Sequence, residues 1–200
     1  MKKNTVLSTV LAAMMFATAG NASAETHLLT KDVKLVKRDT KKVEVKINQP
    51  NVGELDVKLK DIEGVTVYEG SIKGGENVST QFNLNALPNG EYVLNCSNDG
   101  FWSSQHLSIK NGNVEINENS YQESLAPKVE SFALNRFEVT PVTKNIADMA
   151  VAITGSNGEL VYDGYLSSGS RFNLGHLPTG EYAFEFTVAD KTFKKYVKVK

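Results

Sequence analysis

The stretch Phe82-Asn83-Leu84-Asn85-Ala86-Leu87-Pro88-Asn89-Gly90-Glu91-Tyr92 decides the fold, because it returns as Phe172-Asn173-Leu174-Gly175-His176-Leu177-Pro178-Thr179-Gly180-Glu181-Tyr182. The copies differ only at positions 85, 86 and 89 and their counterparts. Each copy predicts a strand that ends, a tight corner and a new strand that begins. Phe82 and Leu84 share one face of the first strand, so both are expected in a core.

The corner itself has a physical explanation in each residue. Leu87 is expected to fill the corner, Pro88 fixes one backbone dihedral angle, and Gly90 permits a positive one. Tyr92 then begins the next strand, as in the tyrosine corner of sandwich domains, where the tyrosine hydroxyl bonds back to upstream backbone. The same structural roles are predicted in the second copy for Leu177, Pro178, Gly180 and Tyr182.

The repetition extends beyond the corner. A shift of 94 residues superimposes Val67-Tyr68 on Val161-Tyr162, and after an extra segment of about four residues near Glu76 to Ser79 the shift becomes 90. Strictly alternating segments such as Val43 to Ile47, with turn signals between them, are typical of strands. No segment shows a helical period. The sequence therefore predicts an all-β chain of two tandem immunoglobulin-like (fibronectin III-like) β-sandwich domains, residues 25–115 and 116–200.

The amino terminus predicts the compartment. Lys2 and Lys3 precede an apolar run from Val6 to Phe16, and small residues lead to Ala24, the order of a secretory signal peptide. We expect residues 1–24 to be removed by cleavage between Ala24 and Glu25. A retained membrane anchor is the alternative, but the apolar run is shorter than the roughly 20 residues that span a bilayer. The mature chain is thus expected to be secreted or periplasmic, with no membrane span.

Charge and cysteine content limit the function further. The mature chain loses two lysines and no acids, so its formal charge is 20 minus 23, or −3. This balance does not favour binding to nucleic acid, which usually needs a basic face. Cys96 is the single cysteine, so no intramolecular disulfide forms, and its place in a predicted strand indicates a buried small hydrophobe.

No catalytic motif is present. The three histidines, His27, His106 and His176, lack metal-ligand spacing, and no Gly-x-Ser-x-Gly elbow occurs. Glu91 and Glu181 recur at equivalent places, but nothing brings them within the ~5–10 Å that a glycosidase pair needs. We therefore expect no enzyme, no cofactor and no metal.

Function is sought where the copies differ. Trp102 and His106 lie on the face of a predicted strand opposite to inward Leu107, and the shift of 90 places Trp102 over Thr192. An outward tryptophan can stack on a sugar ring or anchor a protein contact, which makes Trp102 and His106 candidate ligand contacts. The other interpretation is that Trp102 covers an interdomain contact or a sheet edge.

A family resemblance follows from the second unit, which carries Gly158-Glu159-Leu160-Val161-Tyr162, the corner Leu177 to Tyr182 and a closing Lys194 to Lys200. These residues resemble the immunoglobulin-like carboxy-terminal sorting domain of the type IX secretion system of Bacteroidota, and the chain is similar to short secreted immunoglobulin-like proteins of unknown function. The resemblance covers residues 127–200 and, more loosely, 33–110. The Pro-Asn-Pro opening of sorting domains is missing around Ala126 to Lys128, and there is no large cargo domain.

Three hypotheses follow. The first is a secreted or periplasmic, non-enzymatic protein that acts in envelope interaction or adhesion through an unknown envelope protein or glycan. The second is export through the type IX secretion system with residues 127–200 as the sorting domain. The third is a carbohydrate-binding module that uses Trp102.

Overall fold

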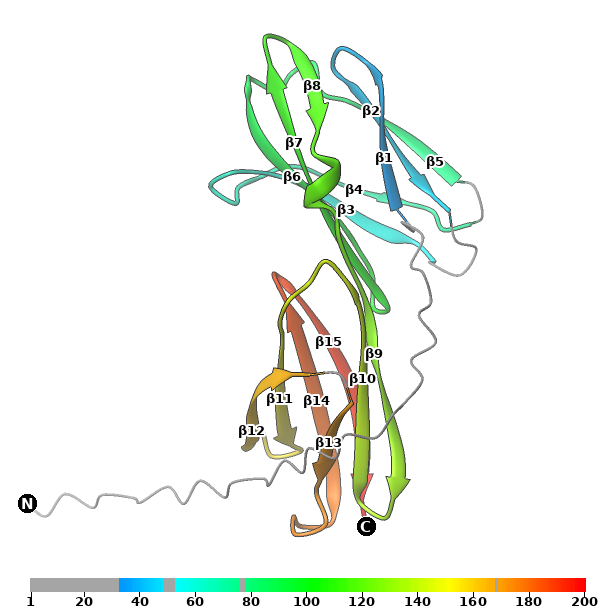
Figure 1. Ribbon diagram of the computed structural model, residues 1–200, viewed down its shortest axis with the longest axis vertical. Helices are drawn as coiled ribbons and strands as arrows, with labels where there is room; N and C mark the ends of the chain where they lie inside the picture. Colours follow the sequence, from blue (N-terminus) through cyan, green and yellow to red (C-terminus); the bar gives the residue numbers. More distant parts are fainter. Residues whose placement is uncertain (1–32, 49–52, 76–77, 168) are drawn as a thin grey trace, which may run out of the picture.

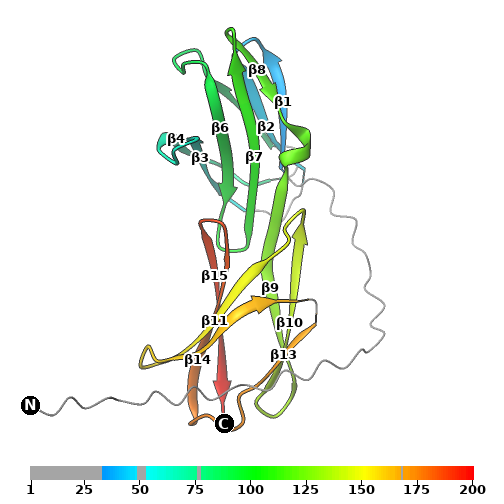
Figure 2. The same ribbon diagram turned by 60° about the vertical axis from the view of Figure 1, so that its left-hand side comes forward.

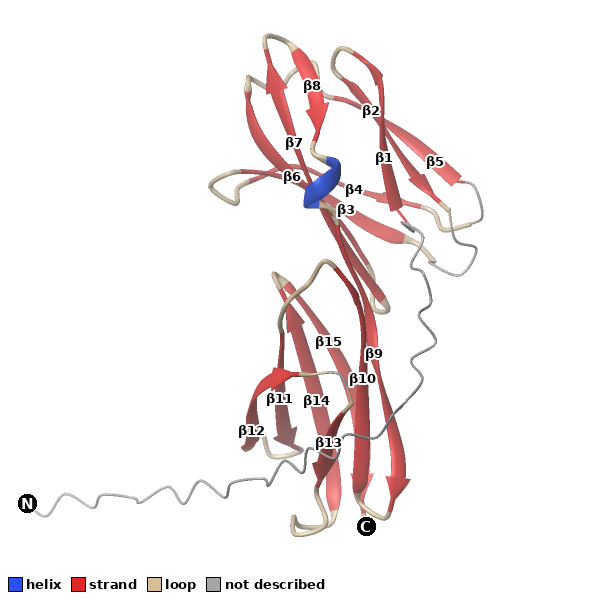
Figure 3. Cartoon of the chain, viewed as in Figure 1, coloured by secondary structure: helices blue, strands red, loops and turns tan. Residues whose placement is uncertain are grey.

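The computed structural model describes residues 33–48, 53–75, 78–167 and 169–200 (Figure 1). The predicted cleavage site between Ala24 and Glu25 lies outside the described residues, as does the beginning of the extra segment at Glu76. Within the described part, all regular structure is strand apart from the short 3-10 helix η1, Glu118–Ser120 (Figure 3). The prediction of an all-β chain is confirmed.

Eight strands form the first half, which we define as residues 33–120. They are β1 (Val33–Asp39), β2 (Lys42–Ile47), β3 (Leu55–Asp61), β4 (Thr66–Ile72), β5 (Val78–Asn83), β6 (Gly90–Ser97), β7 (Phe101–Lys110) and β8 (Asn113–Ile116). The second half, residues 121–200, contains β9 (Gln122–Ala133), β10 (Arg136–Lys144), β11 (Met149–Gly155), β12 (Leu160–Leu166), β13 (Ser170–Asn173), β14 (Gly180–Val188) and β15 (Lys191–Val199).

Alternation in the sequence produces these strands. Along β2, Val43, Val45 and Ile47 are buried while the residues between them are half-buried, so one face of the strand meets the core. Asn98-Asp99-Gly100, a sequence typical of hairpin turns, connects β6 to β7, and the turn closes with the Asn98 N–H donating to the Phe101 carbonyl at 2.9 Å.

Each half is built from a three-stranded and a four-stranded antiparallel layer. In the first half, β1-β2-β5 faces β7-β6-β3-β4. In the second half, β9, β10 and β13 form the three-stranded layer, and β12-β11-β14-β15 forms the four-stranded one. Each half buries its own apolar cluster between its layers.

The halves are joined by backbone pairing. The first residues of β7 pair with β9, from Phe101 opposite Leu125 to Ser104 opposite Gln122. Together with β8, which pairs with the end of β7, this pairing joins the four-stranded layer of the first half to the three-stranded layer of the second in one eight-stranded sheet (Figure 2). The domain boundary predicted from the sequence lies between residues 115 and 116, at the end of β8. No pattern in the sequence indicated that the two halves share a sheet.

The halves also repeat fine detail. The rings of Tyr68 and Phe82 meet edge to face with centroids 5.2 Å apart, and so do the rings of Tyr162 and Phe172, also at 5.2 Å. Gly70 and Gly164 occupy equivalent register positions on β4 and β12. At both glycines an added Cβ would lie within 2.6 Å of the hydroxyl of the tyrosine on the same strand, so the tyrosine side chain would have to move to accommodate it.

Candidate functional site

The repeated corner has the same hydrogen bonds in both halves. The Asn83 side-chain oxygen accepts from the Asn85 N–H at 3.0 Å, which is an Asx turn that ends β5. The Leu84 N–H donates to the Lys41 carbonyl at 2.8 Å, and the Leu87 N–H donates to the Leu84 carbonyl at 3.0 Å. The equivalent bonds in the second half start from Gly175, Leu174 and Leu177.

Tyr92 and Tyr182 close their corners as predicted. The Tyr92 hydroxyl donates to the Pro88 carbonyl at 3.0 Å, and the Tyr182 hydroxyl donates to the Pro178 carbonyl at 2.9 Å. Both rings are buried. Burial raises the pKa of Tyr92, and the negative charge of Asp61 adds to the rise, so the hydroxyl stays protonated and able to donate.

The neighbouring residues agree with the sequence analysis in part. Phe82 and Leu84 are buried as expected, and Leu87 and Leu177 pack partly buried against their cores. The role given to Gly90 and Gly180 is wrong, because neither is among the glycines with positive φ. Both begin a strand, and a Cβ added at Gly90 would lie at an ordinary 3.6 Å from the Tyr92 ring.

Trp102 is not an exposed platform. Its side chain is 2% exposed and belongs to the apolar cluster of the second half, although the residue lies on β7 of the first half. Trp102 lies on the face of β7 opposite to Leu107, as the two-residue period of the strand predicted, but the second half covers that face. A sugar ring therefore has no access to the indole, and the interpretation that Trp102 covers a contact between the halves is the one that the structure supports.

Asp190 forms polar interactions with residues of the first half at this contact. It lies in the two-residue loop between β14 and β15, and its carboxylate accepts from the indole Nε1–H of Trp102 at 3.3 Å. Lys60 on β3 forms an ion pair with the same carboxylate. Burial alone would raise the pKa of Asp190, but the hydrogen bond and the charge of Lys60, with the bond from Trp102, outweigh burial and lower it.

A second polar group, the carboxylate of Glu123, lies where β7 pairs with β9. Glu123 on β9 is fully buried, and its carboxylate accepts a hydrogen bond from the hydroxyl of Tyr121, which is also buried. Lys144 lies opposite Glu123 in the register of β9 and β10. Neither group was predicted from the sequence, because neither Asp190 nor Glu123 is part of a motif and the partners of Asp190 come from distant parts of the chain.

His106 is exposed on β7, as predicted, while its backbone is engaged. The His106 N–H donates to the Ser120 hydroxyl oxygen at 2.8 Å, and its carbonyl accepts from the Asn117 N–H at 3.0 Å. The structure does not bring its side chain together with Trp102, which is buried on the side of the second half. The two candidate contacts therefore do not form one surface.

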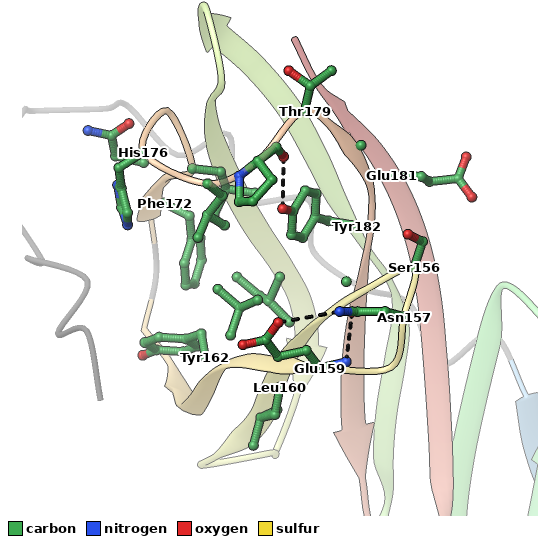
Figure 4. Close-up of a pocket in the computed structure, with 18 of the residues that line it drawn as sticks. Ser156, Asn157, Glu159, Leu160, Tyr162, Phe172, His176, Thr179, Glu181 and Tyr182 are labelled. Atoms are coloured by element: carbon green, nitrogen blue, oxygen red, sulfur yellow. Dashed lines mark hydrogen bonds between the residues drawn. The ribbon is translucent and has the colours of Figure 1, made fainter. Parts of the chain in front are cut away.

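A cavity opens at the second corner. It has a volume of about 820 Å³ and lies where the edge strands β12 and β13 leave the sandwich open (Figure 4). Tyr162, Phe172 and Leu177 are among its apolar lining residues. Asn157 and Glu159 lie at its polar rim, linked by a 3.4 Å hydrogen bond from the amide to the carboxylate.

The corner of the first half has a smaller counterpart. That cavity has a volume of about 270 Å³, and it is lined by Tyr68, Phe82 and Ala86, where the second half has Tyr162, Phe172 and His176. One of the three residue differences between the corners, Ala86 against His176, therefore lines both cavities, and Thr179 also lines the larger one. Glu181 borders the larger one, but its side chain points away from it in Figure 4. The other acidic and histidine residues that line the cavity are Glu159, Asp163 and His176.

The remaining chemistry is sparse within the described residues. Cys96 is buried, and burial raises the pKa of its thiol to about 12, so the thiol is unreactive at neutral pH. Among the described positions, no cluster of three or more histidine, cysteine or acidic side chains is arranged to hold a metal ion. No helix in that part of the chain has the length and apolar character needed to cross a membrane.

Comparison with solved structures returns distant likenesses. One is a biofilm-associated protein, BSP domain, with 14% identity and a TM-score of 0.29 over 84% of this chain. This chain spans 29% of the length of that protein. Another is a segment of two fibronectin type III domains from chicken tenascin, with 9% identity and a TM-score of 0.29, covering 84% of this chain and 98% of the segment. A search of curated proteins returns no match.

A family match is found for the first half. Residues 39–110 match the model of the secretion system C-terminal sorting domain. The match confirms the resemblance, but it falls on the half in which the sequence analysis expected the looser likeness and does not extend to residues 127–200. Both halves contain the same corner, so the corner alone could not show which half is more similar. Residues 39–110 are therefore similar to a type IX secretion system sorting domain, and this similarity implies export to the cell surface or out of the cell.

Proposed function

We propose that this protein is exported through the type IX secretion system and acts at the cell envelope by binding rather than by catalysis. The family match of residues 39–110 supports the route most strongly. The second half repeats the corner of the matched half, down to the hydrogen bond between Tyr182 and Pro178. We assign the sorting signal to residues 127–200, and the partner is an envelope protein or a glycan.

The residues shared by the two halves support a binding rather than a catalytic protein. Tyr92, Leu84 and their counterparts are used in core packing and in backbone hydrogen bonds, which are structural roles. A carbohydrate-binding function through Trp102 is not proposed, because the indole is buried.

Export can be tested by following the chain in two isogenic strains, one with an active type IX secretion system and one in which it is inactivated. We expect the chain on the cell surface or in the medium of the first strain and in the periplasm of the second. Escape of the chain from both strains would reject the route.

The place of the signal is tested separately in the secreting strain. Deletion of residues 190–200 removes β15, and we expect the truncated chain to accumulate in the periplasm. Its periplasmic amount, measured by immunoblot, separates failed export from degradation. Normal export of the truncated chain would show that residues 127–200 are not the signal and would leave the first half as the carrier.

A further inference from the structure

The two halves differ in how the last strand of their four-stranded layer is covered. In the first half, β7 pairs with β6 on one side and with both β9 and β8 on the other. The equivalent strand of the second half, β15, pairs with β14. Among the described residues no strand pairs with the other side of β15, which we call the outer edge.

Hydrogen bonds show which backbone groups face this edge. On β7, His106 directs its N–H and carbonyl away from β6, toward Ser120 and Asn117. The shift of 90 residues places Tyr196 at this position. Directly after β15, the Lys200 N–H donates to the Asn135 side-chain oxygen at 3.0 Å, again away from β14. Because lateral direction alternates along an antiparallel strand, the backbone groups of Thr192, Lys194, Tyr196 and Lys198 face the outer edge.

The side chains at the outer edge determine what can pair there. Lys194, Lys195, Tyr196 and Lys198 are all exposed, with Tyr196 at 64%. The positions equivalent to the three lysines on covered β7 are uncharged Ser104, Gln105 and Ser108. Lysine on an edge discourages pairing with neutral strands, and antiparallel pairing of two β15 strands would bring lysines together. A second copy of this chain is therefore disfavoured, and an acidic strand is favoured.

The strands that cover β7 show the chemistry of a fitting partner. Residues 113–125, which include β8 and the start of β9, contain three glutamates and no lysine or arginine. Glu115 of β8 lies opposite Ser108 and forms a 3.4 Å ion pair with Lys110. The counterpart of Lys110 is Lys200, and the counterpart of Ser108 is Lys198, so an acidic strand on β15 would meet more positive charge than β8 meets on β7.

We propose that the outer edge of β15 binds an extended acidic segment of a partner protein as an added antiparallel strand. Backbone hydrogen bonds to Lys194, Tyr196 and neighbouring residues provide the affinity. The Lys194 ammonium group is already paired with Glu185 at 2.7 Å, so Lys195 and Lys198 select acidic partners. Strand addition at β15 does not require a particular export route. The binding can therefore be absent while the chain is exported by the proposed route, and it can be present when the route is a different one.

The probe is a synthetic peptide with the sequence of residues 113–125, blocked at both ends and labelled with a fluorophore. We expect it to bind the purified full chain, and amide hydrogen exchange to slow at Thr192, Lys194, Tyr196 and Lys198 when the unlabelled peptide is added. Absence of binding at millimolar peptide, or protection at other amides only, would overturn the proposal.

Two substitutions separate strand addition from charge attraction. Tyr196→Pro removes one outward N–H, and we expect it to weaken binding by about tenfold, while Lys198→Glu weakens it through charge. Lys34→Glu, at an exposed lysine of β1, is the matched control and should leave binding unchanged. If Lys198→Glu abolishes binding of the peptide while Tyr196→Pro does not change it, the peptide is held by charge alone and the proposal is wrong. An anionic polysaccharide, tested beside the peptide, that shows the same response to the two substitutions would lead to the same conclusion. The exchange experiment on the unaltered chain decides the question even if the proline variant folds poorly.

Discussion

Tyr92 and Tyr182 show how much one side chain contributes to this fold. Each ring is buried in its own core, and each hydroxyl reaches back four residues to a proline carbonyl. Both bonds are partly buried, and a hydrogen bond of this kind contributes about 1 kcal/mol to stability. The tyrosine hydroxyl therefore adds a side-chain hydrogen bond to the backbone and Asx-turn bonds that already hold each corner.

Replacing either tyrosine by phenylalanine tests this interpretation. We expect Tyr92→Phe and Tyr182→Phe each to lower the free energy of unfolding by about 1 kcal/mol, because the ring stays and the hydrogen bond is lost. Thermal and denaturant melts measure the change. Tyr165→Phe, at a side chain that is 68% exposed, is the control. Equal stability of all three variants and the unaltered chain would contradict the role of the hydroxyl.

Cys96 gives a second measurement at this scale. Because its thiol is buried and its pKa is raised to about 12, we expect it not to react with a thiol reagent in the native protein at neutral pH. Reaction should begin only as denaturant unfolds the first half, with the same midpoint as circular dichroism. Rapid labelling without denaturant would show that the core around Cys96 opens readily.

Individual residues also show where sequence reasoning works and where it stops. Tyr92 and Phe82 were predicted correctly because a local corner and a two-residue period determine their place. Trp102 was not, because periodicity tells which face of a strand a side chain occupies and does not tell what covers that face. Gly90 was expected to permit a positive φ, because glycine adopts it without strain, but the chain does not use that freedom there and is already extended at the start of β6.

At the scale of elements, β7 decides how the molecule is assembled. Its last residues pair with β8 and its first residues with β9, so the strand is covered along its outer side. The sequence predicted the strand that carries Trp102, His106 and Leu107, which is β7. The pairing of β7 with β9 could not be predicted, since it depends on how two compact units meet, and neither strand carries a pattern that specifies the other.

The contact between β7 and the loop that precedes β15 should depend on pH. The pKa of Asp190 is lower in the folded protein than the ordinary value of 3.8, chiefly because Lys60 outweighs the opposing effect of burial. This carboxylate therefore contributes stability that is present above the ordinary pKa and is lost as pH falls through the lower folded value.

Asp190→Asn tests that dependence. We expect the variant to be less stable than the unaltered chain at neutral pH and to lose less stability between about pH 5 and pH 2, because its side chain does not titrate. Lys60→Met should reduce the same pH dependence by removing the cation. Denaturant unfolding at several pH values provides the measurement, and parallel pH profiles for all three proteins would contradict the assignment.

At the scale of the whole molecule, the shared sheet makes the halves interdependent. Trp102 lies on a strand of the first half and in the core of the second, and it is the only tryptophan of the chain. We expect tryptophan fluorescence and circular dichroism to report one coincident thermal transition. Two separated transitions, with the fluorescence change in only one of them, would show that the halves unfold independently.

The continuous eight-stranded sheet also has a mechanical consequence. Tandem domains joined by flexible linkers align under tension, but each domain can still rotate independently of its neighbour. Here the link between the halves is β9, and its pairing with β7 resists tension along the strand axis in shear. If one end of such a protein is fixed to a surface, the paired strands also fix the orientation of the other end. A binding edge on the second half then keeps a constant orientation relative to that surface.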